Sequence, residues 1–139
     1  MKNNILTYLR GSSRNKLIIS FEELPGIHYL NIGEVLSEFL NSRNVDSWHP
    51  LKIKDELHKI LAESIERNSE FGEILSIKNL GILLEEELQI DFLHFLEQYS
   101  LQTPLFLCWN GDSDENTLFF ISKEKGKKLS IKNLSYIKI

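Results

Sequence analysis

Short apolar runs alternate with amphipathic segments along this chain of 139 residues. A run of consecutive apolar residues is typical of a parallel strand buried on both faces, whereas apolar positions three or four apart predict a helix packed on one side. The runs predicted as strands are 16–21, 27–31, 73–78 and 105–109. The alternation of strands and helices predicts an α/β fold with a mostly parallel sheet flanked by helices.

The helices are predicted from the spacing of apolar residues and from residues that are typical of helix ends. A short helix is predicted at residues 3–10, and a second begins near Asn31 and Gly33. Pro50 suits the first turn of a third helix, which we expect to reach about Asn68. A fourth helix is expected at 86–100, with Glu85, Glu86 and Glu87 at its start, where carboxylates complement the helix dipole.

The C-terminal third predicts strands that run back against the sheet. Residues 110–116 have the composition of a hairpin loop, and 117–122 are expected to pair antiparallel with 105–109. Residues 129–139 then end the chain as an edge strand or as a strand followed by a tail. We therefore expect a single domain over residues 1–139 with antiparallel strands at its C-terminal edge.

Composition narrows the class of protein. No apolar run approaches the roughly 18 residues that a membrane span requires, and the N-terminus lacks the pattern of a signal peptide. The single cysteine, Cys108, lies in the apolar run 105–109 and is interpreted as a small buried hydrophobe. A cytoplasmic location is expected.

Charge is distributed unevenly. Residues 123–139 carry a net charge of +5, so residues 1–122 carry −9 of the total of −4. The basic segment could contact nucleic acid, with Trp109 or Tyr136 as a stacking residue, or could protect an edge strand from aggregation, which we favour because the remainder is acidic. The candidate contacts in the segment are Lys123, Lys125, Lys127 and Lys128.

Few residues suggest catalysis or a cofactor. The four histidines form no zinc-binding pattern, and no serine-nucleophile motif is present. Asn110, which closes the strand 105–109, could be a sensor of bound ligand, because ligands gather beyond the carboxyl ends of parallel strands. Asn-Gly is also a common turn signal. Trp109 is favoured as a core residue. We expect no cofactor and no metal.

Four short motifs nevertheless resemble one family, the small P-loop protein BrxF of type 3 BREX phage-exclusion systems. Residues 29–33 resemble its Y-L-N strand-to-helix junction, and 79–83 its Walker B region. The helix leading to Tyr99 and Ser100 resembles its P-L-x-x-L-x-x-x-S helix, and Trp109-Asn110-Gly111 its W-N-G sensor strand. The resemblance runs from about residue 16 to the C-terminus and implies a P-loop fold and a role in phage defence.

The departures from that family fall on the nucleotide-binding residues. The family's Walker A loop and helix are replaced by residues 22–26, and no G-x-x-x-x-G-K-[ST] occurs in the chain. Lys78 stands where the Walker B aspartate would be, and Gly81 where the following glutamate would be. Phosphate, magnesium and the attacking water would each lose their ligands. The sequence therefore predicts a degenerate P-loop protein without ATPase activity.

The resulting hypothesis is a non-catalytic, ATPase-like subunit of a bacterial antiviral defence system that acts through association with itself or with a larger protein. The alternative is a nucleic-acid-binding accessory protein. An active hydrolase would need another anion site, such as a helix N-terminus near residues 31–33. Loss of the first βα unit would expose apolar surface, so Leu24, Ile27 and Tyr29 are candidate contact residues. They could equally be core residues covered by residues 3–10.

Overall fold

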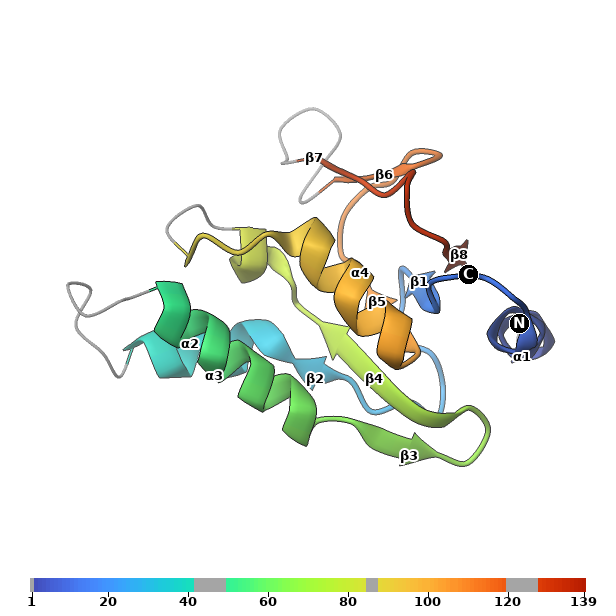
Figure 1. The fold of residues 1–139 in the computed structure, drawn as a ribbon, viewed down its shortest axis with the longest axis horizontal. Coiled ribbons are helices and arrows are strands. Elements are labelled where there is room, and N and C mark those ends of the chain that lie inside the picture. Colours follow the sequence, from blue (N-terminus) through green and yellow to red (C-terminus); the bar gives the residue numbers. More distant parts are fainter. Residues whose placement is uncertain (1, 42–49, 85–87, 120–127) are drawn as a thin grey trace.

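The computed structural model describes residues 2–41, 50–84, 88–119 and 128–139 (Figure 1). It is an α/β structure with a mostly parallel sheet flanked by helices. The helices are α1 (Lys2–Arg10), α2 (Ile32–Asn41), α3 (Pro50–Glu63), the short 3-10 helix η2 (Gly81–Leu84) and α4 (Phe92–Gln102). The strands are β1 (Leu17–Ser20), β2 (Leu30–Asn31), β3 (Glu66–Asn68), β4 (Gly72–Lys78), β5 (Leu105–Cys108), β6 (Thr117–Phe119), β7 (Lys128–Ser130) and β8 (Ile137–Lys138).

Five strands of the main sheet are parallel and lie in the order β2-β4-β5-β1-β8. Strand β5 is central, with β4 on one side and β1 on the other. Strand β4 is the longest, and its outer edge is shared: β2 pairs with its end, and β3 pairs antiparallel with its beginning. The carboxyl ends of β1, β4 and β5 consequently lie at one edge of the sheet.

Alternation along the central strands divides the core into two parts. Leu105 and Leu107 belong to the larger part, together with the buried residues of α2, α3 and α4. Phe106, between them, belongs to the smaller part, which includes Ile5 of α1 and Ile18 of β1. Helices α2, α3 and α4 therefore cover one face of the sheet, and α1 contributes to covering the other.

The predicted helix 50–68 is too long. Helix α3 ends at Glu63, where the backbone N–H of Ser64 donates to Leu61 O at 3.1 Å. Residues 66–68 form β3 instead, because Asn68 Oδ1 accepts from the N–H groups of Glu70 and Phe71 and closes a tight turn. Gly72, with φ of 80°, brings the chain back as β4. The polar connection expected at 41–48 lies almost wholly outside the described residues.

The fourth helix begins later than predicted. Its N-cap is Asp91, whose Oδ1 accepts from the backbone N–H of His94 at 3.1 Å, so the glutamates at 85–87 are not in its first turn. These glutamates lie outside the described residues. The helix also extends to Gln102, and it ends where the N–H of Thr103 donates to Tyr99 O ahead of Pro104.

The pairing predicted for the C-terminal third is wrong. Strand β5 already has β4 and β1 beside it, so 117–119 cannot join it and pair antiparallel with β7 in a separate two-stranded sheet. The chain then returns to the main sheet, and β8 lies parallel to β1, with Ile137 opposite Ile18. The edge of the main sheet formed by the C-terminal residues is therefore parallel, not antiparallel.

Replacing Phe106 by alanine should lower the free energy of unfolding by about 3–5 kcal/mol, because a wholly buried ring would leave a cavity. Its side chain is fully buried, and its ring lies 5.3 Å from that of Phe71. Urea unfolding measures the change. The control is Leu101→Ala on α4, where the side chain is 39% exposed and a loss near 0.5 kcal/mol is expected. Equal losses for the two variants would contradict the packing described here.

Candidate functional site

The carboxyl edge of the sheet gathers charged side chains from strands far apart in the sequence. Lys78, the last residue of β4, places its Nζ 3.3 Å from both carboxylate oxygens of Glu23. Glu23 lies just after β1, in the turn where the resemblance would put a phosphate-binding loop. The two side chains are 30% and 54% exposed, respectively, so water reaches both.

Cys108 lies opposite Lys78 in the register of β4 and β5. Burial raises the pKa of its thiol, the negative charge of Glu23 raises it further, and Lys78 acts in the opposite direction. A raised pKa keeps the sulfur protonated at neutral pH, which is the opposite of what a nucleophilic cysteine needs. Cys108 is thus a buried core residue beside the ion pair, as the sequence indicated.

The connection from β1 to β2, residues 21–29, contains no helix. Two of its backbone N–H groups are already used: that of Leu24 donates to the Tyr29 hydroxyl at 3.3 Å, and that of Ile27 donates to Leu24 O. The Ser20 hydroxyl donates to Glu22 O at 2.8 Å and holds the start of the turn to the sheet. Those two N–H groups are therefore not available to a phosphate, which is bound by a nest of free N–H groups.

The junction between β2 and α2 is closed by side chains. Asn31 Oδ1 accepts from the backbone N–H of Glu34 at 3.0 Å, which caps α2, and from Asn79 Nδ2 at 2.8 Å. A Cβ atom on Gly33 would lie 2.6 Å from the backbone oxygen of Asn79, so only glycine permits this approach. The N-terminus of α2, suggested above as another anion site, is therefore occupied by Asn31.

The Trp109-Asn110-Gly111 segment anchors the separate β6–β7 sheet. Trp109 is 2% exposed, and its indole N–H donates to Phe119 O at 3.0 Å. A Cβ atom on Gly111 would lie 1.9 Å from the same oxygen. Trp109 is thus a core residue, as favoured, and its use as a stacking platform for a base is excluded by burial. Asn110 is exposed at the end of β5 and makes no hydrogen bond within the described residues.

The other site residues predicted from the sequence do not lie together in the structure. Leu24 and Ile27 are each 8% exposed and lie in the smaller core with Ile5 of α1, so these two are core residues rather than exposed contacts. Tyr29 is half-buried beside them, and burial raises its pKa. Gly81 is buried at the start of η2. Lys128 is exposed on β7, and Lys123, Lys125 and Lys127 lie outside the described residues.

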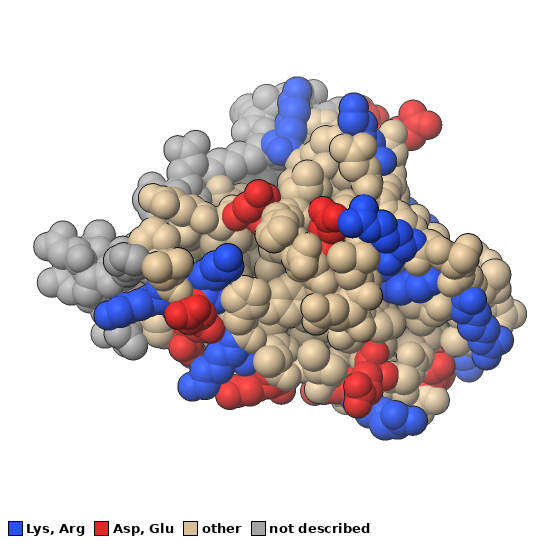
Figure 2. Space-filling model, in the orientation of Figure 1, with Lys and Arg blue, Asp and Glu red and all other residues tan. Residues whose placement is uncertain are grey.

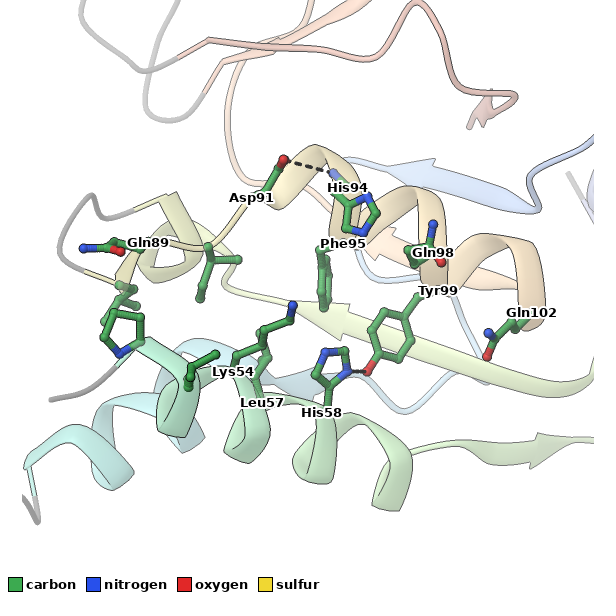
Figure 3. Close-up of a pocket in the computed structure, with 14 residues that line it drawn as sticks. Lys54, Leu57, His58, Gln89, Asp91, His94, Phe95, Gln98, Tyr99 and Gln102 are labelled. Atoms are coloured by element: carbon green, nitrogen blue, oxygen red, sulfur yellow. Dashed lines mark hydrogen bonds between the residues drawn. The ribbon is translucent and has the colours of Figure 1, made fainter.

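A pocket of about 590 Å³ between α3 and α4 is a second candidate site, which the sequence did not predict (Figure 3). Lys54, Leu57 and His58 enter it from α3, and Phe95 and Tyr99 from α4. The Tyr99 hydroxyl and His58 Nδ1 form a short hydrogen bond. The sequence signal was weak, because a histidine and a tyrosine on two amphipathic helices are usually boundary residues.

Comparisons with protein-family models, with curated proteins and with solved structures give no match for this chain. Within the described residues, no group of three or more His, Cys, Asp or Glu side chains lies close enough to hold a metal ion. No helix in the same part of the chain is long and apolar enough to cross a membrane.

Replacing Gly111 by alanine should lower the free energy of unfolding by about 1–3 kcal/mol, because the new methyl group would overlap the backbone oxygen of Phe119. The matched control is Gly11→Ala, where the nearest atom would be 3.4 Å away and little change is expected. Urea unfolding compares the two variants. A Gly111→Ala protein as stable as the control would show that the close approach to Phe119 is not needed.

Proposed function

We propose that this chain is a non-catalytic, ATPase-like subunit of a bacterial antiviral defence system and acts through association with another protein. The resemblance to BrxF supplies the expected setting. The mostly parallel strand order supports a P-loop-like fold, and β5, which directly precedes the W-N-G motif, lies between β1 and β4. The resemblance would make β1 the strand before the phosphate loop and β4 the Walker B strand.

The observation that carries the proposal is the ion pair between Glu23 and Lys78. A hydrolytic site needs cations around the phosphates and an acid at the Walker B position to hold magnesium. Here the signs are reversed, with a lysine at the end of β4 and a carboxylate in the turn after β1. Because Glu23 would repel phosphate and Lys78 would repel magnesium, the pair opposes both ligands.

Association with a protein partner is the mode of action that we favour for a domain without nucleotide-binding residues. The connection 21–29 and α1 already cover part of the second face of the sheet, so we expect contacts at other surfaces. Exposed apolar side chains at Leu51 and Leu101 offer such surfaces on α3 and α4.

Nucleic-acid binding is the weaker proposal. Of its two candidate stacking residues, Trp109 is buried, whereas Tyr136 is partly exposed and its hydroxyl donates to Glu115 O and Asn116 Oδ1. Lys138 Nζ donates to the backbone oxygens of Asp114 and Glu115. On the face shown in Figure 2, acidic and basic side chains are mixed on the left and below, and basic ones follow one another along the right-hand side. The acidic side chains on this face would repel the phosphates of a nucleic acid.

The first test is calorimetry with ATP and magnesium, for which we expect no binding heat. Lys78→Asp, which restores an acid at the Walker B position, should not produce hydrolysis, because one carboxylate cannot replace the missing phosphate loop. Micromolar, magnesium-dependent binding by the wild-type protein would contradict the proposal. Turnover by the Lys78→Asp protein would reveal a second phosphate site.

The second test asks whether the ion pair stabilises the fold. Lys78→Asp should lower the free energy of unfolding by up to about 1 kcal/mol, because two carboxylates would then face each other across a partly exposed site. Combining it with Glu23→Lys restores opposite charges and should recover most of that loss. A double variant no more stable than Lys78→Asp would show that Glu23 and Lys78 do not interact in solution.

The third test addresses association in cells. The tagged chain, expressed at its native level in its own host, should co-purify with a larger protein, and deleting its gene should raise phage plating efficiency. Light scattering of the purified chain identifies self-association. Unchanged plating, together with a monomer that captures nothing, would remove the basis for a defence subunit.

A further inference from the structure

The pocket between α3 and α4 has the features of a site for a small ligand. Its volume of about 590 Å³ falls within the range of drug-sized sites, and its floor is apolar, formed by Leu57, Leu88 and Phe95, all of which are buried. It lies on the face of the sheet covered by α3 and α4, where the larger core is found, whereas Leu24, the residue after Glu23, belongs to the smaller core. The pocket is therefore separate from the degenerate nucleotide site.

Rings form one wall of this pocket. Tyr99 lies between Phe95 and His58, with ring centroids 5.0 and 5.5 Å away, and the His58 and Tyr99 rings are stacked at 24°. The series continues inward through Phe92 to buried Trp109. Ring faces held in place by such contacts favour a flat, aromatic ligand over a flexible aliphatic one.

Most of the polar side chains that enter the pocket are hydrogen-bond donors without an acceptor among the described residues. Lys54 and the side-chain amides of Gln98 and Gln102 make no hydrogen bond or ion pair within the described residues. Figure 3 shows Lys54 and His58 rising from α3 towards the side chains of α4. The only acid among the lining residues is Asp91, and its carboxylate is engaged with the backbone N–H of His94.

The Tyr99 hydroxyl and His58 Nδ1 form a hydrogen bond that joins α4 to α3 at the wall of rings. Burial raises the pKa of Tyr99, so its hydroxyl stays protonated at neutral pH. The rings, the Lys54 ammonium and the side-chain amide N–H groups of Gln98 and Gln102 complement a ring system that bears a negative charge.

We propose that the pocket between α3 and α4 binds a planar aromatic anion, with the ring against Phe95 and Tyr99 and the negative group at Lys54. The site would let a small metabolite or signal influence the surface formed by α3 and α4. This inference does not depend on the proposed defence function, because it rests on the pocket alone.

The probe is anilinonaphthalene sulfonate, an aromatic anion whose fluorescence rises in apolar surroundings. The folded wild-type protein should bind it at one saturable site, and Lys54→Glu should weaken binding by about tenfold or more, because it replaces attraction by repulsion. The matched control is Lys59→Glu, the same charge change on an exposed residue of α3 that does not line the pocket. It should bind like the wild type.

Amide-resolved NMR locates the probe, since the side-chain NH₂ signals of Gln98 and Gln102 should shift on titration. Gln98→Trp, a change at an exposed position that fills the pocket, should abolish binding without altering the unfolding temperature. Equal weakening by Lys54→Glu and Lys59→Glu, or unshifted glutamine signals, would overturn the proposal. If the Lys54→Glu protein bound ATP as well as the wild type did, the ATP site would lie outside this pocket. That result would contradict the proposed loss of the nucleotide site, and the proposal for the pocket would stand.

Discussion

The rest of the structure depends on the pairing of β5 on both of its edges. All four of its residues are buried, and each lies in register with one residue of β1 and one residue of β4. Because neither edge of β5 is free, the chain after Trp109 must leave the sheet, and it forms β6 and β7 as a separate antiparallel pair. The same alternation along β5 sends Leu105 and Leu107 to one core and Phe106 to the other.

The buried strands could be predicted from the sequence. The polar strands could not, because they form only where a partner strand or a turn holds them. Strands β1, β4 and β5 are apolar because both of their faces are covered, so their runs are visible without knowledge of their partners. Strand β3 reads Glu-Arg-Asn and lies at an edge, where pairing depends on the turn made by Asn68 and on Gly72. The predicted start of α4 is too early, because three consecutive glutamates are typical of a first helical turn, and this signal outweighs that of the single N-cap residue Asp91.

The candidate sites, too, could be predicted only where single residues suffice, and not where the fold brings distant residues together. Lys78 could be singled out from the sequence because a Walker B acid was expected there, yet its partner, Glu23, is 55 positions away and only the fold brings them together. The burial of Leu24 and Ile27 depends on α1 packing against the sheet through Ile5, an alternative that the sequence left open. The pocket between α3 and α4 was missed because its residues come from two helices that are adjacent only after folding.

Three of the motifs that resemble those of BrxF have structural roles here. Asn31 and Asn79 join the ends of β2 and β4, Gly33 permits their approach, and the Trp109-Asn110-Gly111 segment anchors β6 through Trp109 and Gly111. The departures from that resemblance fall at positions that would contact phosphate or magnesium in an ATPase. A scaffold can keep its strand junctions while its nucleotide ligands are replaced, because the two sets of residues form different contacts. That separation is why an ion pair can occupy the edge of this sheet without disturbing the junctions around it.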